Sequence, residues 1–124
     1  MIDIKKLKYT KDHEWVHINN DIATIGVTDF AQSELGDIIF IEFPNQGDVF
    51  KQNESVGTLE AVKTVADIYS PVSGSIVEIN SDLDSNPELI NSDPYNDGWI
   101  VKIKIEDSSE IDGLLDLDSY NELI

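Results

Sequence analysis

The 124-residue sequence contains neither cysteine nor arginine. Without cysteine the chain forms no disulfide, and it offers no thiol nucleophile and no thiolate metal ligand. Without arginine it lacks the forked donor that proteins use to contact guanine edges and phosphate groups. It also lacks an apolar run as long as a signal-peptide core or a membrane span. These absences predict a cytoplasmic protein that binds neither nucleic acid nor membranes.

Positive charge is scarce as well, because eight lysines stand against 25 aspartates and glutamates and give a formal net charge of -17 at pH 7. A field of this sign repels nucleic acid and anionic membranes, and it can steer docking onto basic surfaces of partner proteins. The length is sufficient to bury a hydrophobic core without a metal or a disulfide. We therefore expect a single acidic domain over residues 1–124.

The stretch HEWVH at residues 13–17 has the H-E-x-x-H spacing of zinc proteases, in which two histidines one helical turn apart hold the metal. Here Trp15 and Val16 favour a strand, and a turn follows. On a strand, residues four apart lie about 13 Å from each other, too far for one ion to join His13 and His17. No third histidine exists. The pattern favours two solvent-facing histidines on an edge strand over a zinc site.

Other catalytic and metal-binding patterns are also absent. The sequence has no G-x-S-x-G elbow, no P-loop and no G-x-G-x-x-G run. Two groups of aspartates, Asp82 with Asp84 and Asp93 with Asp97, do not fit the twelve-residue calcium loop with its central glycine and terminal glutamate. The sequence therefore presents no recognisable catalytic constellation, and it predicts no metal site.

Short apolar stretches that alternate with polar residues, and that turn residues often interrupt, predict a mainly β fold. Asn19, Asn20 and Asp21 supply a turn between the first two predicted strands, which are expected to form a hairpin. The strand-like stretches are residues 14–18, 22–27 and 37–43, four pieces between 47 and 80, and residues 99–105.

A short helix is predicted directly after the first hairpin, over residues 28–35. Thr28 or Asp29 is suited to cap its N-terminus, with Gln32 as the capping-box partner of Asp29. Gly36 is suited to end the helix, because glycine adopts at low cost the left-handed conformation that terminates many helices.

The C-terminal region is predicted to be helical in short pieces. Residues 81–91 look irregular or part-helical, and residues 108–115 and 119–124 have the pattern of two short helices. Ser119 is expected to cap the second of them, with Glu122 at the capping-box position. No interdomain linker precedes these helices.

Lys63 occupies an unusual link between two predicted strands. The four residues of this link, Ala61 to Thr64, include no glycine, proline, asparagine or aspartate. An exposed ammonium group is a poor nucleophile at neutral pH because it is protonated. On a tight link between rigid strands, however, it can be presented to a modifying enzyme that supplies the base and the activated acyl group. The residues alone leave this role and that of a solvated turn lysine both open.

Six stretches of the sequence carry a specific resemblance to one family: residues 9–16 (YTKDHEWV), 23–36 (ATIGVTDFAQSELG), 60–63 (EAVK), 69–74 (YSPVSG), 86–91 (NPELIN) and 93–103 (DPYNDGWIVKI). Together they resemble the glycine cleavage H proteins nearly from end to end. On this resemblance the modified lysine falls on Lys63, its preceding glutamate on Glu60, and its flanking glycines on Gly47 and Gly74. The serine that usually precedes Val-Lys is Ala61 here, and the two residues after the lysine are bulkier than usual.

The resemblance implies a barrel-sandwich hybrid of two antiparallel sheets, of the lipoyl- and biotinyl-domain type, with Lys63 on an exposed hairpin and helices at the C-terminus. It also implies a carrier rather than an enzyme. Lipoic acid, joined covalently to Lys63, would carry an aminomethyl group within the glycine cleavage system. Glu60, Gly47 and Gly74 are implied to contribute to recognition by the modifying enzyme.

The implied partners are the enzymes that load, unload, reoxidise and attach the lipoyl arm. A pyridoxal-phosphate glycine decarboxylase would supply the aminomethyl group, and a tetrahydrofolate-dependent aminomethyltransferase would remove it. A dihydrolipoamide dehydrogenase containing FAD would then reoxidise the dithiol. Attachment of the arm would require a lipoate ligase, or an octanoyltransferase together with lipoyl synthase. All these partners are inferred from the resemblance alone.

Two acidic residues are candidates for contacts with the loaded arm, whose terminal amine is expected to be cationic. We expect the acidic surface near the hairpin to hold this amine through charge-assisted hydrogen bonds, with Glu14 and Asp67 as the contacts. Held in this way, the labile aminomethyl group would be less exposed to water between visits to the enzymes.

Three alternatives remain open on the sequence. A biotin carrier also has a lysine on a hairpin. Biotin carrier domains resemble each other in placing a methionine on each side of that lysine, where this chain has Val62 and Thr64. A lipoyl relay would donate lipoyl groups to 2-oxoacid dehydrogenase complexes. An unmodified acidic interaction domain would carry no prosthetic group at all.

Overall fold

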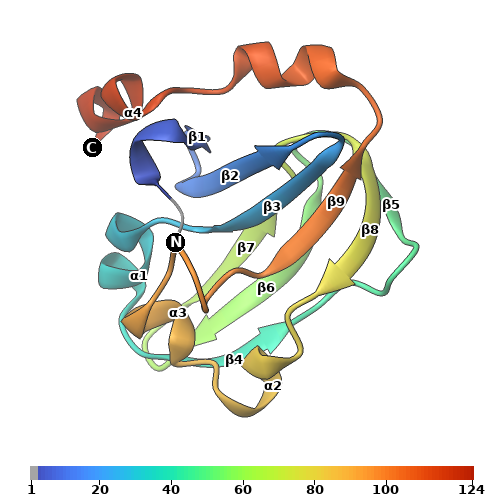
Figure 1. Ribbon diagram of the computed structural model, residues 1–124. Coiled ribbons are helices and arrows are strands. Elements are labelled where there is room, and N and C mark those ends of the chain that lie inside the picture. Colours follow the sequence, from blue (N-terminus) through green and yellow to red (C-terminus); the bar gives the residue numbers. More distant parts are fainter. Residues whose placement is uncertain (1–2) are drawn as a thin grey trace.

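The computed structural model of the protein describes residues 3–124, and these residues form a mainly β structure (Figure 1). None of the helices in this range is long and apolar enough to cross a membrane. The strands are β1 (Lys8–Tyr9), β2 (Glu14–Asn19), β3 (Ile22–Val27), β4 (Ile38–Glu42), β5 (Val49–Phe50), β6 (Ser55–Ala61), β7 (Val65–Tyr69), β8 (Gly74–Ile79) and β9 (Val101–Ile105). The α-helices are α1 (Asp29–Leu35), α2 (Asp82–Ser85), α3 (Leu89–Ser92) and α4 (Leu117–Leu123), and Ile4–Lys6 and Ser108–Gly113 form 3-10 helices.

Two antiparallel sheets enclose the main hydrophobic core. The larger sheet has the strand order β1-β2-β3-β9-β8-β5, and the smaller one has the order β4-β6-β7. Val16 and Ile25 of the larger sheet and Leu59 and Ile68 of the smaller sheet are buried in one cluster. The predicted fold class, a barrel-sandwich hybrid with short helices, is confirmed.

The first predicted hairpin is present. The pairing of β2 with β3 runs as far as Asn19 opposite Ile22, which leaves Asn20 and the next residue as the turn. Asn20 has a φ of 57°, a left-handed conformation that asparagine tolerates better than most residues. The predicted edge position of this strand was wrong, because β1 pairs with β2 on its other side. A strand of two residues is too short to leave a periodic signal in the sequence.

Strand β2 is buried on both faces. Val16 faces the main core, whereas Trp15 faces a second apolar cluster that includes Tyr120. The Trp15 ring lies over Gly26, the residue opposite it on β3, where a Cβ atom would come within 2.6 Å of the ring. The indole N–H of Trp15 donates to the carbonyl of Pro94 at 2.9 Å. This packing fixes the strand that carries Glu14.

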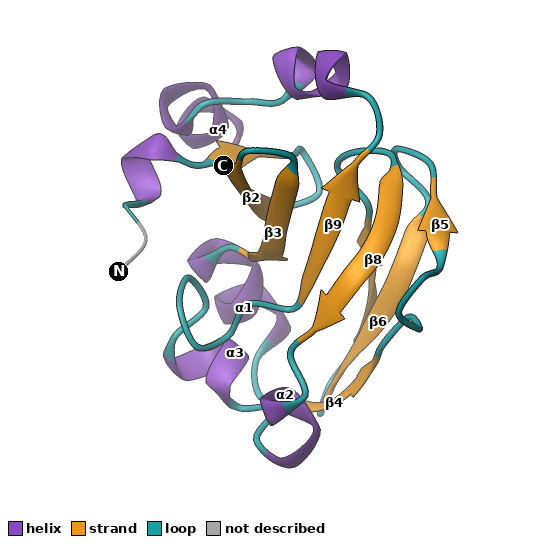
Figure 2. Ribbon diagram, turned by 45° about the vertical axis from the view of Figure 1, so that its right-hand side comes forward, coloured by secondary structure: helices purple, strands orange, loops and turns teal. Residues whose placement is uncertain are grey.

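The C-terminal segment covers the outer face of β1 and β2 (Figure 2). Tyr120 of α4 stacks on Tyr9 of β1 with 4.8 Å between ring centroids. The predicted Ser119 cap was wrong, because Asp116 caps α4 by accepting a hydrogen bond from the Ser119 N–H at 2.8 Å. Aspartate and serine are about equally good N-caps. Because α4 starts earlier than predicted, one more apolar residue of the helix packs on the second apolar cluster. Glu122 consequently lies in the last turn of α4 rather than at a capping-box position.

Helix α1 forms over the predicted residues and ends where predicted. Thr28 is its N-cap and accepts a hydrogen bond from a backbone N–H of the first turn. The Gln32 side chain donates to Asp29 at 2.9 Å, but because both residues lie within the helix this pair is not a capping box. Gly36 ends the helix with a φ of 78° and donates its N–H to the carbonyl of Gln32.

Candidate functional site

The β6–β7 hairpin presents Lys63 at its exposed tip. The two strands are paired as far as Glu60 and Val65, and the N–H of Ala61 donates to the carbonyl of Thr64 at 2.8 Å. No residue from 61 to 64 has a left-handed backbone conformation. The link therefore needs no glycine, and this explains the absence of the usual turn residues.

The hairpin tip is attached to the turn that follows α1. The N–H of Val62 donates to the carbonyl of Asp37 at 3.1 Å. The side chain of Lys63 lies over Gly36, where a Cβ atom would be 3.4 Å from the Lys63 Cε atom. The methylene groups of the lysine thus lie close to the backbone of this turn.

Asn91 of α3 holds the same turn from the other side. Its side-chain amide donates to the carbonyl of Gly36 at 2.8 Å and to the side chain of Gln32 at 3.0 Å. Its side-chain oxygen accepts the N–H of Ile38 at 2.9 Å. One side chain thus fixes the backbone before and after the turn on which Lys63 rests. Our interpretation of the sequence did not single out Asn91, whose only signal was its place in the NPELIN stretch.

The three residues predicted to contribute to modification lie in two different places. Glu60 is exposed on β6, three residues before Lys63. Gly74 begins β8, at the end of the molecule opposite the β6–β7 link (Figure 1). Gly47 lies near it, since its N–H donates to the carbonyl of Ile76 in β8. The structure therefore brings Glu60 to the hairpin but not the two glycines, and their role in recognition stays a prediction.

Glu14 is buried, with 2% of its surface exposed, and does not belong to the acidic surface on which we expected it. One carboxyl oxygen accepts the Thr10 hydroxyl at 2.6 Å, and the other accepts the backbone N–H of Tyr69 at 3.1 Å. Burial raises the pKa of Glu14 from its ordinary value of 4.5 to about 7, although both hydrogen bonds favour the charged form. Glu14 therefore gains or loses its proton near neutral pH.

Glu14 and Asp67 line one cavity of about 160 Å³ beside the hairpin. Most of its wall is apolar and comes from α1, β6 and β7. Asp67 is exposed at its rim, whereas Glu14 lies deeper. Leu35 contributes to the wall and directly precedes Gly36, against which Lys63 rests. The two acidic residues predicted from the sequence thus share a cavity whose wall extends to the residue before the Gly36 turn.

The raised pKa of Glu14 is expected to make the protein less stable as the pH rises from about 4.5 to about 7. A carboxyl group with a higher pKa in the folded state holds its proton more tightly there, so its stabilisation is complete at low pH and is lost through this window. The loss corresponds to about 3 kcal/mol in the free energy of unfolding. The Glu14→Gln variant cannot ionise at this position. Its free energy of unfolding relative to the unchanged protein, measured in urea between about pH 4 and pH 8, should rise by that amount.

A matched control is Glu34→Gln, because Glu34 lines the same cavity but is exposed. Its free energy of unfolding should follow that of the unchanged protein at every pH. If the Glu14→Gln variant and the unchanged protein also gave parallel curves, the raised pKa would be contradicted.

The two histidines of the HEWVH stretch have different surroundings. His17 lies in β2, whereas His13 precedes that strand with a left-handed φ of 70°. The Nδ1 atom of His13 is 2.9 Å from the Tyr120 hydroxyl, which is 2.7 Å from the hydroxyl of Thr28. Both histidines are half-buried, so the predicted solvent-facing position was wrong. The contact of His13 with α4 could not be predicted locally, because Tyr120 lies 107 residues later in the chain. Within residues 3–124 no three His, Asp or Glu side chains are grouped to hold a metal ion.

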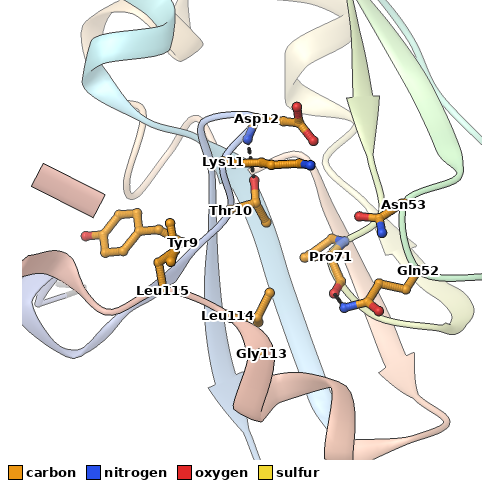
Figure 3. Close-up of a pocket in the computed structure, with 10 residues that line it drawn as sticks. All are labelled: Tyr9, Thr10, Lys11, Asp12, Gln52, Asn53, Pro71, Gly113, Leu114 and Leu115. Atoms are coloured by element: carbon orange, nitrogen blue, oxygen red, sulfur yellow. Dashed lines mark hydrogen bonds between the residues drawn. The ribbon is translucent and has the colours of Figure 1, made fainter. Parts of the chain in front are cut away.

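A second cavity, of about 230 Å³, opens between the β1–β2 loop, the β5–β6 turn and the segment that follows residue 112 (Figure 3). Lys11 and Asp12 lie on one side of it, and Gln52 and Asn53 on another. The Gln52 side chain donates to the carbonyl of Pro71 at 3.1 Å and thereby holds the local backbone. None of the residues singled out for a carrier function lines this cavity.

Comparison with known proteins leads to the family that the motifs resemble. The model of the family described as glycine cleavage H-protein matches residues 7–124. A glycine cleavage system H protein of Staphylococcus carnosus is 51% identical over 120 residues, which cover 97% of this chain and 95% of that protein. The corresponding protein of Symbiobacterium thermophilum is 50% identical over 115 residues, which cover 93% of this chain and 90% of that one.

A solved structure is similar over the same extent. The crystal structure of a glycine cleavage system H protein from Mycobacterium marinum superposes with a TM-score of 0.88 at 33% sequence identity. The match covers 98% of this chain and 97% of that one. The similarity therefore includes both sheets, the exposed hairpin and the C-terminal helices.

Proposed function

Since the chain belongs to the glycine cleavage H-protein family, it is a lipoyl carrier of the glycine cleavage system rather than an enzyme, and we propose that Lys63 bears the lipoyl group. The observation that supports this most directly is the exposure of Lys63 on a hairpin tip that two hydrogen-bonded strands and the Gly36 turn hold in place. In residues 3–124, no carboxylate forms a salt bridge with the Lys63 amine. The amine is thus free to enter the active site of a modifying enzyme. We propose one lipoyl-carrier domain over residues 1–124.

The residues around Lys63 fit a covalently attached acyl arm. When bound, lipoic acid supplies a disulfide that opens as it takes up an aminomethyl group and that is later re-formed by oxidation. Amide formation removes the positive charge of Lys63, which reduces the attraction of its side chain to the acidic hairpin surface. The first part of the arm, the lysine side chain, lies against the Gly36 turn. These features would let the arm move while its attachment point stays fixed.

The carrier function is tested by reconstitution with a pyridoxal-phosphate glycine decarboxylase. Protein with one lipoyl group should support the release of labelled CO2 from glycine, and its mass should increase by one aminomethyl group. The unmodified protein should do neither. A lipoylated protein that is never loaded would contradict the proposal, even if the modification itself were present.

We also propose that Glu14 and Asp67 hold the cationic end of the loaded arm in the cavity that they share. An ammonium group that enters this cavity would favour the ionised form of Glu14, because a nearby opposite charge lowers the pKa of a carboxyl group. The apolar wall would exclude water and strengthen the resulting charge-assisted hydrogen bonds. The cargo would consequently be shielded from hydrolysis between enzymes.

Combined replacement by Glu14→Gln and Asp67→Asn is expected to speed spontaneous loss of the aminomethyl group by about tenfold, the effect of losing one or two hydrogen bonds to a charged group. The loss is measured by mass spectrometry on loaded protein after the enzymes have been removed. The control is Asp82→Asn with Glu122→Gln, two exposed acids that do not line the cavity. An equal rate of loss in all three proteins would defeat the proposed contacts.

The remaining partners follow from this assignment and stay predictions. They are the tetrahydrofolate-dependent aminomethyltransferase, the FAD-containing dihydrolipoamide dehydrogenase, and the enzymes that attach the arm, namely a lipoate ligase or an octanoyltransferase with lipoyl synthase. The cytoplasmic location and the absence of nucleic-acid and membrane partners also stay predictions.

A further inference from the structure

Strand β4 has a bulge beside the Lys63 hairpin. Ile38 pairs with Ala61, and the next residue to pair is Phe40, opposite Glu60. Ile39 is therefore an extra residue on β4, and such a residue reverses the faces to which the following side chains point. Ile38 is buried, but Ile39 and Phe40 are 53% and 54% exposed. The bulge thus turns two successive large apolar side chains toward solvent.

Phe40 belongs to a row of three side chains across the smaller sheet. Glu60 of β6 lies opposite Phe40 on one side and opposite Val65 of β7 on the other. Residues directly opposite each other in antiparallel strands point to the same face, with Cβ atoms about 4.5–5.5 Å apart. Val65 is 59% exposed, so an apolar side chain flanks Glu60 on each side. Val62, 73% exposed at the hairpin tip, extends this apolar surface to Lys63.

Negative charge surrounds this apolar surface. Asp37, Glu42 and Asp67 are all exposed, and the last two lie in the next cross-strand row of the sheet, on either side of Thr58. An exposed group of apolar side chains with a charged rim is typical of a protein-binding surface. The complementary partner has an apolar centre and a basic rim.

The reach of the lysine side chain indicates which partner binds here. An enzyme that attaches an acyl group must bring its active site to the Lys63 amine itself, which lies only a four-carbon stem from the backbone. It must therefore contact the side chains around the hairpin tip. Enzymes that act on the finished arm meet its far end, beyond the additional acyl chain, and can do so without covering β4. The apolar surface is consequently best matched to the enzyme that modifies the lysine.

We propose that Ile39, Phe40, Val62 and Val65 form a docking surface for the lipoate ligase that acylates Lys63. The proposal rests on the assignment of Lys63 as the carrier residue, and it extends recognition from the hairpin to the neighbouring strand β4. In the reaction the neutral Lys63 amine attacks the carbonyl of the acyl adenylate. A carbon–nitrogen bond forms, the bond from the acyl carbon to the phosphate oxygen breaks, AMP leaves, and the amine gives up a proton.

The test measures kcat/KM for acylation of the unmodified protein by a lipoate ligase with lipoate and ATP, followed by intact mass. The Phe40→Thr and Val65→Thr double variant keeps residues that suit a strand but removes the two apolar side chains that flank Glu60, half of the proposed surface. Its kcat/KM should fall about tenfold, mainly through a higher KM, as expected when central apolar contacts of an interface are lost. Val49→Thr is the matched control, because Val49 is 67% exposed on β5 of the other sheet. It should leave kcat/KM unchanged.

Two further measurements keep the outcomes distinct. The double variant should have the thermal unfolding midpoint of the unchanged protein, and once fully lipoylated it should be reduced by dihydrolipoamide dehydrogenase at the normal rate. An unchanged kcat/KM for acylation would overturn the docking surface while leaving the carrier function intact. An equal loss in the dehydrogenase reaction would overturn the assignment to the ligase. Failure of the unchanged protein to be acylated at Lys63 would instead overturn the carrier assignment.

Discussion

The Lys63→Arg variant is expected to gain no lipoyl group under conditions in which the unchanged protein is fully modified. Acyl transfer needs a neutral amine, and the arginine guanidinium keeps its proton because it is much more basic than an amine. Arginine nevertheless retains the positive charge and a similar length, and Lys63 makes no salt bridge in the described residues, so the hairpin should remain intact. The expected effect is therefore complete loss of modification without loss of the fold, measured as intact mass after incubation with ligase, lipoate and ATP.

The matched control is Lys51→Arg. Lys51 is also exposed and lies next to a turn, but this turn precedes β6 and is not the tip of the β6–β7 hairpin. It should be lipoylated as completely as the unchanged protein. A lipoyl mass increase that persists in Lys63→Arg would place the arm on another lysine and refute the assignment. In the decarboxylase assay the Lys63→Arg variant should support no CO2 release, and the Lys51→Arg variant should support the normal rate.

Most of the strands could be predicted because their signals are local. The turn residues around Asn20 lie between two alternating apolar stretches, and the predicted hairpin is present, with pairing that extends to Asn19 and Ile22. Helix α1 could be predicted for the same reason, since Thr28 and Gly36 mark its ends within a few residues. The exposed position of Lys63 also follows locally from two strands joined by a short link. Where neighbouring residues determine the conformation, the pattern was sufficient.

The environment of Glu14 could not be predicted from its neighbours. Its burial depends on β2 being covered on both faces, and one of its hydrogen-bond donors is the backbone N–H of Tyr69, 55 residues later. The bulge that exposes Phe40 is equally hidden, because IIFIE gives the same apolar pattern whether or not one residue is left unpaired. Each case depends on contacts between distant segments. The sequence therefore indicates which residues form the site more readily than which of them are buried.

Gly74 is a second position at which a single change should have a large effect. It lies in an interior strand, opposite Phe50 of β5 and Ile105 of β9. A Cβ atom at this position would lie 2.0 Å from the backbone carbonyl oxygen of Lys104 and 2.6 Å from a methyl group of Ile103. A backbone atom cannot move aside as a flexible side chain can. Glycine at this position thus has a steric reason that is independent of any modifying enzyme.

The Gly74→Ala variant is expected to lose about 3–4 kcal/mol in its free energy of unfolding, because β8 and β9 must separate locally and weaken their hydrogen bonds. For a chain of this length the thermal midpoint should fall by roughly 10–15 °C. Gly113→Ala is the control, since no atom lies within 4 Å of its added Cβ and its φ is not left-handed. It should shift the free energy of unfolding by at most about 0.5 kcal/mol.

The same variant separates a structural role of Gly74 from the predicted role in recognition. If the glycine serves only sheet packing, then well below the lowered thermal midpoint the folded Gly74→Ala protein should be lipoylated at the normal rate, because the β6–β7 link, which contains Lys63, lies at the end of the sheets opposite the start of β8 (Figure 1). If the ligase contacts Gly74, the rate should fall although the protein is folded. The close approach of the Lys104 carbonyl oxygen to a Cβ atom at this position favours a purely structural role, and therefore a normal rate of lipoylation. A normal rate would leave Glu60 and the surface around Phe40 as the recognition elements close enough to the lysine to act on its modification.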